Sequence, residues 1–578
     1  MADSPFDESR RLTGINPYFD ECGAALEALG EYINATVLRD WRANVERLCA
    51  ALHWPAPHIV VLEHASGASL AFTAPVDQLY SATEVNEWAL LAALPVAVQK
   101  QYALDAPEQP VGWDEEAALC TLRTQAREEH IAGLAELVAT AATHGLNVLL
   151  DEEALTIGSG VCGHTWPLDA LPQPDAVPWG SLGDIPMALV TGSNGKTTTV
   201  RLLAAMARVH GWRCAHSCTD GVFSDGAMLE AGDYSGPAGA RATLRQSVEA
   251  AVLETARGGI LRHGLAMQHA RAAVVTNVSD DHFGEYGIHD LGALAQVKLT
   301  VARPLGEQGV LAINADDALL VRHAERLQCE LAWFAHDDAH PLLETHRAQG
   351  GSTCAVRDGH LHLFHAGADH DLGVIDAMPL TFAGRARYNI GNIAAATLAA
   401  AALDIDAVTI ADVLMRFGSS QADNPGRLQQ WDVHGIKVLV DYAHNPEGLR
   451  ALLEVVAPLR GDGRLGLVLG QAGNREDDDI RALAAAAAAF APDRVMLKDI
   501  AGYERGRTPG EVAALLRDEL ARHGCAGDAV IECLDEFEAA RHLLEWAHPG
   551  DMLVLPIHAA EAREQVNALL SAAQASRG

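Results

Sequence analysis

Residues 187–199, MALVTGSNGKTTT, decide the fold of this chain, because an apolar run leads into a glycine-rich turn and then into lysine and threonine. We expect a buried strand over 187–190 and a helix over 200–209, joined by a turn at Gly192 and Gly195. In that arrangement the backbone N–H groups at the start of the helix face a bound anion. The stretch therefore predicts a phosphate-binding loop.

Two side chains of this turn have a predicted role with a nucleoside triphosphate. Lys196 would reach the terminal phosphates, and the Thr197 hydroxyl would complete the coordination of a magnesium ion. The predicted nucleotide-binding positions of the turn are Gly192, Ser193, Asn194, Gly195, Lys196, Thr197 and Thr198. The first glycine comes later than in the usual phosphate loop, so an ordinary glycine turn before a lysine is the alternative. We expect ATP and Mg²⁺ as cofactors.

The chain is acidic. Its 578 residues include 42 Lys and Arg against 77 Asp and Glu, which gives a net charge of −35. This charge argues against nucleic acid polymers and anionic membranes as partners that bind through a general basic surface. The N-terminal residues lack the apolar core of a signal peptide, and no stretch approaches the roughly 18 apolar residues of a membrane span. We expect a cytoplasmic protein whose ten scattered cysteines are reduced.

Changes in composition divide the chain into three predicted domains. Residues 1–175 alternate helical stretches, such as 116–144, with strand-like runs, and a proline-rich connector at 166–179 marks their end. Residues 176–424 alternate strands and helices as a phosphate-loop domain with a mostly parallel sheet does. Residues 425–578 contain strand-like runs between alanine-rich helical segments. The predicted fold is α/β, with a central phosphate-loop ATPase domain and a C-terminal Rossmann-like domain.

A second glycine pattern lies in the first region. Gly158, Gly160 and Gly163 match the G-x-G-x-x-G spacing of dinucleotide-binding proteins. That fingerprint needs a helix directly after it, and Pro167 and Pro172 prevent a long one. We therefore expect a glycine loop that contacts substrate or packs on the neighbouring domain, and no nicotinamide or flavin site.

Eight motifs follow one another along the chain. They are TGSNGKTTT, LETARGGILRHGL, TNVSDDHFG, the lysine in AQVKLTVA, NADD, YNIGNIAAA, NPGRLQ and DYAHNP. In this order they resemble Mur ligases, and they are most similar to the Mur-ligase half of cyanophycin synthetases. The resemblance implies a three-domain Mur-ligase-like architecture. It also implies an ATP-dependent, ADP-forming ligase that lacks the ATP-grasp domain which cyanophycin synthetases carry before their Mur half.

The resemblance assigns metal ligands in addition to Thr197. Glu254 ends an apolar strand, so its carboxylate would face the phosphate loop and bind magnesium; capping of the following turn is the alternative. His282 matches a residue that helps to hold a second magnesium ion. Lys298 matches a lysine that is carbamoylated in several Mur ligases and then binds metal as an anion. An unmodified lysine in a salt bridge is the alternative for Lys298.

Further nucleotide contacts follow from the same resemblance. Asn389 and Asn392 lie one helical turn apart, so both amides can face the adenine edge, although Asn389 could instead cap a helix. Arg427 matches an arginine that reaches a phosphate from the domain junction. The alternative is that Arg427 forms a structural ion pair between the domains. Asp441 follows a predicted strand at its carboxyl end and is assigned to the ribose or the phosphates.

The remaining predicted residues bind substrate or take part in catalysis. The predicted substrate-binding residues are His444, Asn445, Arg475, Arg505 and Arg507, although charged loop residues are also commonly solvated. The predicted catalytic residues are Lys196, Glu254, His282, Lys298, Arg427 and Asp441.

The implied reaction is amide bond formation through an acyl-phosphate. With one ligation site, the chain would join an amino acid or an aspartyl dipeptide to a carboxylate, so its partners would be small-molecule amino acid or peptide substrates. A folyl-polyglutamate or muropeptide-type ligase is one alternative, and a noncatalytic or glutaminase-coupled protein on a Mur scaffold is another. A homodimer or a higher homo-oligomer is left open.

Overall fold

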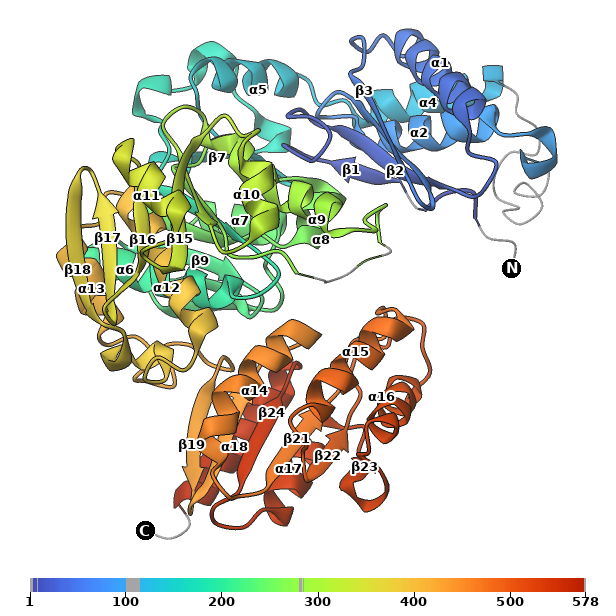
Figure 1. The fold of residues 1–578 in the computed structure, drawn as a ribbon. Helices are drawn as coiled ribbons and strands as arrows, with labels where there is room; N and C mark the ends of the chain where they lie inside the picture. Colours follow the sequence, from blue (N-terminus) through green and yellow to red (C-terminus); the bar gives the residue numbers. More distant parts are fainter. Residues whose placement is uncertain (1–3, 8, 100–114, 280–282, 284, 576–578) are drawn as a thin grey trace.

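A large central sheet carries the glycine-rich turn, with an N-terminal region and a C-terminal domain beside it (Figure 1). The computed structural model describes residues 4–7, 9–99, 115–279, 283 and 285–575. The predicted α/β class and three-part architecture are confirmed. In these ranges no helix combines the length and the apolar character needed to cross a bilayer.

The predicted strand before the turn is β8 (Met187–Thr191), which lies between β12 and β13 in the central sheet. In spatial order the strands of this sheet are β11 (Ala227–Ala231), β10 (Gly221–Ser224), β9 (Cys214–Cys218), β12 (Ala250–Glu254), β8, β13 (Ala272–Val275), β14 (Val310–Asn314), β15 (Glu330–Asp337), β16 (Thr353–Arg357), β17 (His360–His365) and β18 (Ala368–Val374). In this spatial order the strands from β9 through β8 to β16 run parallel to one another, and the two outermost strands at each edge are antiparallel.

Helices cover both faces of the central sheet. Alternate residues of β8 point to opposite faces, so Ala188 and Val190 join one apolar cluster while Met187 and Leu189 join the other. The first face holds α6 (Lys196–His210), α12 (Arg387–Ala402) and α13 (Ala407–Leu414). The second holds α7 (Pro237–Leu244), α8 (Arg257–His263), α9 (Leu291–Lys298), α10 (Ala318–Ala324) and α11 (Pro341–Ala348).

The parallel strands place the predicted site at one edge of the sheet. β8, β12 and β13 are neighbours that run in the same direction, so the residues that follow them meet at their carboxyl ends. The glycine-rich turn, Glu254 and Thr276 come together there although they are far apart in the sequence.

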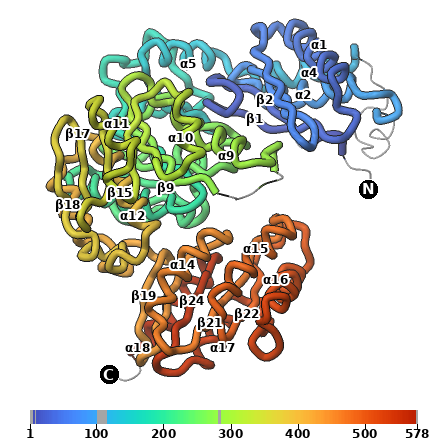
Figure 2. Tube along the Cα trace, in the orientation of Figure 1, coloured from blue at the N-terminus to red at the C-terminus, as the bar shows by residue number. Residues whose placement is uncertain are grey.

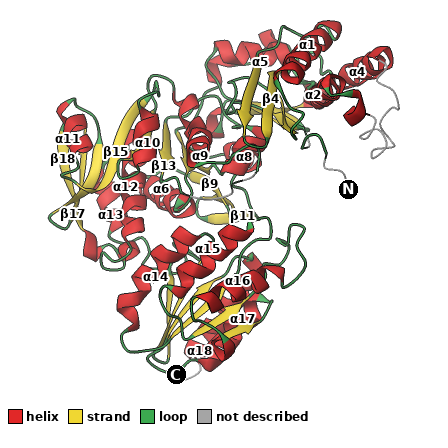
Figure 3. Cartoon of the chain, turned by 45° about the vertical axis from the view of Figure 1, so that its right-hand side comes forward, coloured by secondary structure: helices red, strands yellow, loops and turns green. Residues whose placement is uncertain are grey.

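The C-terminal domain is a second α/β unit, which lies below the central sheet in Figure 1 and is seen from another side in Figure 3. Its strands are, in spatial order, β19 (Gln429–Val433), β20 (Ile436–Asp441), β24 (Met552–Pro556), β21 (Leu465–Leu469), β22 (Arg494–Leu497) and β23 (Val530–Glu532), of which only β19 is antiparallel. One face packs against α14 (Pro446–Arg460), α15 (Asp477–Ala488) and α16 (Glu511–Arg522). The other packs against α17 (Glu536–Trp546) and α18 (Ala560–Ala575).

The N-terminal region forms two bodies along the chain (Figure 2). An antiparallel sheet holds β1 (Arg10–Leu12), β2 (Gly23–Leu29), β4 (Gly67–Thr73) and β3 (Ile59–His64), covered by α1 (Ala35–Ala51), α2 (Leu79–Ala93) and α4 (Glu115–Glu129). A smaller body follows, with α5 (Leu134–Thr143), β5 (Val148–Leu150), β6 (Ala154–Ile157) and β7 (His164–Pro167). The continuous helix expected over 116–144 was wrong, because the chain turns at Gly133, whose φ is 83°.

The second glycine pattern packs on the central domain, and no long helix follows it. A Cβ on Gly160 would meet Val248 O at 2.4 Å, and the Val161 N–H donates to the same carbonyl. A single-turn 3-10 segment lies within the pattern, and the strand β7 follows it. The loop therefore joins the smaller N-terminal body to the edge of the central domain.

We predict that His216 makes the stability of the central domain depend on pH. Its ring stacks on Phe223 at a centroid distance of 4.7 Å, and burial, followed by Arg201 and Arg208, lowers the pKa of His216 to about 3. The unfolded chain binds this proton near pH 6.5, so acid favours unfolding. The free energy of unfolding should fall by about 2 kcal/mol between pH 8 and pH 5 through this residue. Denaturant titrations at several pH values should show that the free energy of unfolding of His216→Phe changes less with pH than that of the wild type, by this amount. The same change with pH in both proteins would contradict the prediction.

Candidate functional site

The turn between β8 and α6 requires glycine at two positions. Gly192 has a φ of 149°, and a Cβ there would lie 1.8 Å from Thr276 Oγ1. Gly195 has a φ of 87°, and a Cβ there would lie 2.1 Å from Asn392 Oδ1. Both the left-handed backbone and the close approach of neighbouring side chains exclude other residues. The glycines therefore fix the path of the loop against β13 and α12.

This path leaves backbone donors at the start of α6 open to a ligand. Among the described residues, no protein acceptor faces the N–H groups of Gly195, Lys196, Thr197 and Thr198. The helix is 15 residues long, and its dipole places partial positive charge at the same end. Lys196 Nζ donates to Gly192 O at 3.1 Å and to Ser193 O at 3.2 Å, so the ammonium lies over the loop. The arrangement suits an anion.

The segment after β13 holds the loop in this shape. Asn277 accepts from the Asn194 N–H through Oδ1 at 2.9 Å and from the Ser193 N–H through its carbonyl at 3.0 Å. Thr276 Oγ1 donates to Asn194 O at 2.6 Å. Because these bonds are made within the protein, the loop is already ordered before a ligand arrives.

Glu254 lies beside the loop at the end of β12. Its Oε2 accepts from Thr197 Oγ1 at 2.8 Å, and its Oε1 accepts from Thr219 Oγ1 at 2.8 Å. The following helix α8 is capped at Ala256 without a side-chain bond, so Glu254 does not act as its cap. Carboxylate and hydroxyl oxygens are the ligands that Mg²⁺ prefers, and such sites combine one or two protein ligands with phosphate oxygens. No group of three or more His, Cys, Asp or Glu in the described ranges could hold a metal ion.

A cavity of about 170 Å³ extends from the loop to α12 and the C-terminal domain. Asn389 and Asn392 line it, and Asn392 Nδ2 donates to Asn389 Oδ1 at 3.0 Å. Asn389 Nδ2 donates to Leu380 O, and the cap position of α12 is Ala386, so Asn389 does not cap that helix. Asp441 lines the same cavity and accepts from the N–H groups of Leu428 and Ala443. Burial raises the pKa of Asp441 despite these donors.

The C-terminal domain reaches the loop directly. Asn445 Nδ2 donates to Asn194 Oδ1 at 3.0 Å, and Asn445 also caps α14 by accepting from the Gly448 N–H. Asn194 Nδ2 donates to Glu447 Oε2 at 3.3 Å. The start of α14 thus touches the phosphate-binding loop when the two domains are in this position.

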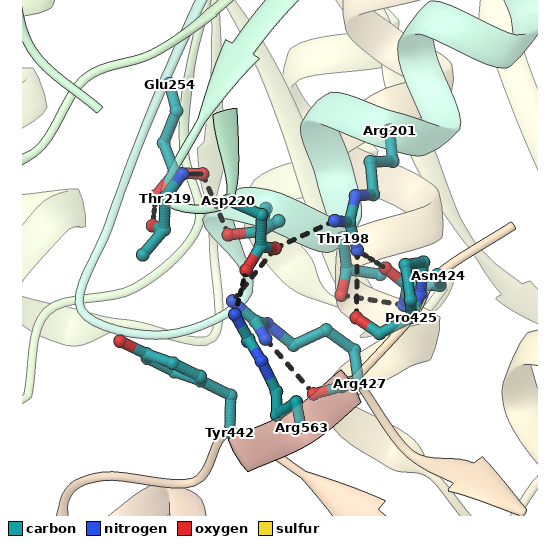
Figure 4. Close-up of polar contacts among 12 residues, drawn as sticks. Thr198, Arg201, Thr219, Asp220, Glu254, Asn424, Pro425, Arg427, Tyr442 and Arg563 are labelled. Atoms are coloured by element: carbon teal, nitrogen blue, oxygen red, sulfur yellow. Dashed lines mark hydrogen bonds and ion pairs between the residues drawn. The ribbon is translucent and has the colours of Figure 1, made fainter. Parts of the chain in front are cut away.

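A second contact between these domains centres on Asp220 (Figure 4). Its carboxylate accepts from Arg201 of α6 and from Arg563 of α18, and Arg427 Nη2 lies 3.7 Å from Oδ2. Burial tends to raise the pKa of Asp220, but the three guanidinium groups outweigh it and hold the pKa below its usual value. Arg427 also lies over the ring of Tyr442, at 4.1 Å from the centroid.

The hinge segment before β19 completes this contact. Asn424 Nδ2 donates to Thr198 Oγ1 at 3.1 Å, and Arg201 Nη1 donates to Pro425 O at 3.1 Å (Figure 4). One carboxylate therefore serves three guanidinium groups, and one of these, that of Arg427, lines the cavity.

A buried charged group supports the loop after β20 from behind. Lys498 is fully buried, bonds to Glu536, and lies 2.8 Å from Nδ1 of His558. Burial, followed by Lys498, lowers the pKa of His558 to about 4, so its ring is neutral. Because Lys498 must donate to Nδ1, the ring proton is on Nε2 and is donated to Ala443 O at 3.2 Å. This chain of bonds fixes the loop that carries Tyr442 and His444.

A cleft of about 1080 Å³ opens between the N-terminal region, the central domain and the C-terminal domain. It adjoins the smaller cavity, because both are lined by Lys196, Thr219, Glu254, Tyr442 and His444. Lys298 is buried and also lines the cleft. The phosphate-binding loop is thus accessible from two sides.

Comparisons with known proteins agree with this geometry. A family model described as the Mur ligase middle domain matches residues 190–400, and one described as Mur ligase, glutamate ligase domain, matches residues 426–556. The UDP-N-acetylmuramoyl-L-alanyl-D-glutamate--2,6-diaminopimelate ligase of Ectopseudomonas mendocina (strain ymp) is 31% identical over 63% of this chain and 71% of that relative. The chain belongs to the Mur ligase family.

The cyanophycin synthetases are similar over a smaller share of their length than this diaminopimelate ligase. The cyanophycin synthetase of Geminocystis herdmanii (strain PCC 6308) is 35% identical over 64% of this chain, but the match spans only 42% of that relative. The chain therefore spans less than half the length of the cyanophycin synthetases it matches. The structure of E. coli FolC in complex with ADP matches 68% of this chain and 90% of that chain, with a TM-score of 0.47 and 17% identity.

The structure brings most of the predicted site residues together. The loop residues Ser193 to Thr198, Glu254, Asn389, Asn392, Arg427, Asp441 and His444 line the smaller cavity, while Lys298, Arg475 and Arg505 line the cleft. Arg507 lines neither cavity and instead donates to Gly473 O and Arg475 O. His282 lies outside the described residues, so its assignment to a metal site stays a prediction.

Several residues at the site carried no recognisable signal in the sequence. Asp220 and Arg563 are 343 positions apart, and the buried set of Lys498, Glu536 and His558 spans three separate segments. The hinge residue Asn424 lay within the NPGRLQ motif, but its bond to Thr198 could not be inferred from that motif. Only tertiary structure joins these residues.

We predict that Gly195→Ala weakens ADP binding by about tenfold or more, because the new Cβ would meet Asn392 Oδ1 and displace the loop from its N–H groups. The matched control is Gly211→Ala, where φ is also positive, at 105°, but where a new Cβ would have no atom within 4 Å. It should lose about 1 kcal/mol of stability and keep its ADP affinity. Titration with a fluorescent ADP analogue measures the affinity of each variant, and equal affinities of Gly195→Ala and Gly211→Ala would contradict the prediction.

We also predict that Asp220→Asn destabilises the contact between the central and C-terminal domains by about 3 kcal/mol, because three guanidinium groups would lose their shared counter-charge. The control is Asp404→Asn, which breaks a surface pair with Arg271 and should cost less than about 1 kcal/mol. Denaturant titration measures the cost, and small-angle scattering should show a larger radius of gyration for Asp220→Asn. A compact variant of unchanged stability would refute this role.

Proposed function

We propose that the chain forms amide bonds at the expense of ATP, which is cleaved to ADP and phosphate. One observation carries the proposal: the smaller cavity and the large cleft meet at Lys196 and Glu254, beside the open N–H groups of α6. A nucleotide in the smaller cavity would present its terminal phosphate to a substrate in the cleft. Coupling of phosphoryl transfer to an acceptor needs this arrangement.

The reaction would proceed in two displacements. A carboxylate oxygen of the acceptor attacks the γ-phosphorus, the bond from phosphorus to the β-γ bridging oxygen breaks, and ADP leaves with that electron pair. The nitrogen of an amine then attacks the acyl carbon of the acyl-phosphate, the bond to the phosphate oxygen breaks, and the nitrogen loses a proton. The loop N–H groups and Lys196 stabilise negative charge on the transferred group.

Thr197 and Glu254 would hold a magnesium ion, which neutralises phosphate charge when it is bound. Asn389 and Asn392 would face the adenine, and Asp441 the ribose or the phosphates. Arg427 would reach the phosphates from the hinge, where Asp220 and Tyr442 orient it. Lys298 would become a further anionic ligand if it is carbamoylated, and intact-mass analysis in bicarbonate buffer tests this.

The substrates we propose are an amino acid or an aspartyl dipeptide as the amine and a carboxylate as the acceptor. Similarity to cyanophycin synthetases over their matched segment supports this class. Similarity to the diaminopimelate ligase supports a muropeptide acceptor as the second candidate. Phosphate release measured with amino acids, aspartyl peptides, folates and muropeptides separates these classes from one another.

We predict that Lys196→Ala lowers the rate of ADP formation by at least about a hundredfold, because it removes the cation over the loop. The control is Lys437→Ala, whose ammonium donates to Leu459 O and which is not among the described residues that line either cavity. Coupled assays of ADP release with the best substrate of the panel measure the rate. Full activity of Lys196→Ala, or no ADP release by the wild type with any substrate while ADP still binds, would overturn the proposed function.

A further inference from the structure

A two-residue turn, Thr219 and Asp220, connects β9 to β10. Cys218 and Gly221 pair directly across this hairpin, so no further residue lies between the two strands. The two side chains of the turn have different partners. Thr219 faces Glu254, and Asp220 faces three guanidinium groups at the domain junction (Figure 4). The turn therefore touches the proposed metal site and the C-terminal domain at the same time.

The register of the central sheet places Thr219 beside Glu254. Leu253 of β12 pairs in parallel with Ser217 of β9, so the residues that follow these two strands meet at their carboxyl ends. Thr219 Oγ1 donates to Glu254 Oε1 at 2.8 Å, and the Thr219 N–H donates to Oε2 at 3.4 Å. Two donors from one residue thus hold the plane of the carboxylate.

The orientation of Glu254 depends on two threonines. Thr197 donates to Oε2 at 2.8 Å, but it is itself a proposed ligand of the magnesium ion. Among the described residues no lysine or arginine forms an ion pair with Glu254, although its side chain is buried. Thr219 is therefore the anchor of this carboxylate outside the metal site. Loss of such an outer hydrogen bond typically weakens metal binding by about 10- to 100-fold.

The backbone of the turn is held as one unit. The Gly232 N–H donates to Asp220 O at 3.3 Å, and the Tyr234 N–H donates to Cys218 O at 3.1 Å. Both donors lie just after β11, which pairs with β10. One peptide unit separates Thr219 from Asp220 and sets their Cα atoms about 3.8 Å apart. A shift of Asp220 is therefore carried to Thr219.

The partners of Asp220 come from both sides of the domain junction. Arg201 belongs to α6 of the central domain, and its Nη2 donates to Asp220 Oδ2 at 2.8 Å. Arg427 lies in the hinge and Arg563 in α18, so their positions follow the C-terminal domain. A displaced C-terminal domain leaves the carboxylate with only the first of these three arginines. The forces on the turn thus depend on domain position.

We propose that the Thr219–Asp220 turn couples docking of the C-terminal domain, meaning its contact with Asp220, to divalent-cation binding, with Thr219 as the positioning residue that orients Glu254. The inference rests on the proposed function only in that Thr197 and Glu254 hold the cation. With the domain docked, Asp220 is fixed, Thr219 is held against Glu254, and the carboxylate is oriented for the cation. The coupling is reciprocal, so a bound cation favours the docked arrangement by the same factor.

The first test removes the hydroxyl of Thr219. Thr219→Val should weaken Mn²⁺ binding to the ADP complex by about tenfold or more, whereas Thr219→Ser, which keeps the hydroxyl, should stay within about threefold of the wild type. Mn²⁺ prefers the same oxygen ligands as Mg²⁺. Protein in excess over ADP keeps the nucleotide bound, and the EPR signal of free Mn²⁺ then measures the cation affinity.

The matched control is Thr243→Val. Thr243 is buried in α7, and its hydroxyl has no hydrogen-bond partner in the part of the chain that the structure describes. Its loss should leave the Mn²⁺ affinity unchanged. The melting temperature and the ADP affinity in EDTA verify that each variant is folded. A Thr219→Val protein that also loses its ADP affinity in EDTA would have a general structural defect, and this result would overturn the inference.

The second test separates the domain contact from the hydroxyl. Arg563→Gln should weaken Mn²⁺ binding by about fivefold in the wild-type background, because Asp220 loses a partner from the C-terminal domain. In the Thr219→Val background the same change should alter the Mn²⁺ affinity by less than about twofold, because the link is already broken. The control Arg517→Gln, which breaks a surface pair of α16, should have no effect in either background.

Additive effects of Thr219→Val and Arg563→Gln, or an unchanged Mn²⁺ affinity in either single variant, would overturn the inference. A wild-type complex that binds Mn²⁺ no more tightly than free ADP does would also overturn it. The proposed function fails by a different measurement, the absence of ADP release with every substrate. Mn²⁺ binding is scored without turnover, so either proposal can fail alone.

Discussion

The backbone N–H groups at the first turn of α6 are the constraint on which the site depends. A helix start leaves such donors without partners, and here no described protein atom satisfies them. The glycines that leave them open also bring the loop into contact with Thr276, directly after β13, and with Asn392 of α12. The loop thus takes its shape from two neighbouring elements and presents a preformed cradle to the space between the domains.

Near that loop, several guanidinium groups share one carboxylate. In a chain with a net charge of −35, one carboxylate, Asp220, serves three guanidinium groups at the junction of the central and C-terminal domains. Glu254 is instead bonded to two hydroxyl groups beside the loop. Cations and an anion are therefore both available where a metal-bound nucleotide would lie. Two of the three arginines come from the hinge and the C-terminal domain, so the charge balance depends on domain position.

The local parts of this arrangement were predictable from the sequence. The strand, the turn and the helix around Gly192 were found because their signals lie within a few neighbouring residues, and the spacing of Asn389 and Asn392 fixed their common face. The helix break at Gly133 was missed, since a lone glycine is tolerated in many helices. Asp220, Arg563 and Lys498 were missed for another reason. Their partners are remote in the chain, and an isolated charged residue is most often solvated.

The buried pair of Lys498 and Glu536 has an implication for the history of this domain. Replacement of either residue alone would leave an unpaired charge in the interior, next to His558, and such a change is strongly destabilising. Exchange of both for apolar residues would be tolerated by the core, but would release the imidazole and the carbonyl of Ala443 that it holds. The two positions are therefore expected to change in concert among related sequences. Lineages that have lost the pair together should also differ in the loop that follows β20.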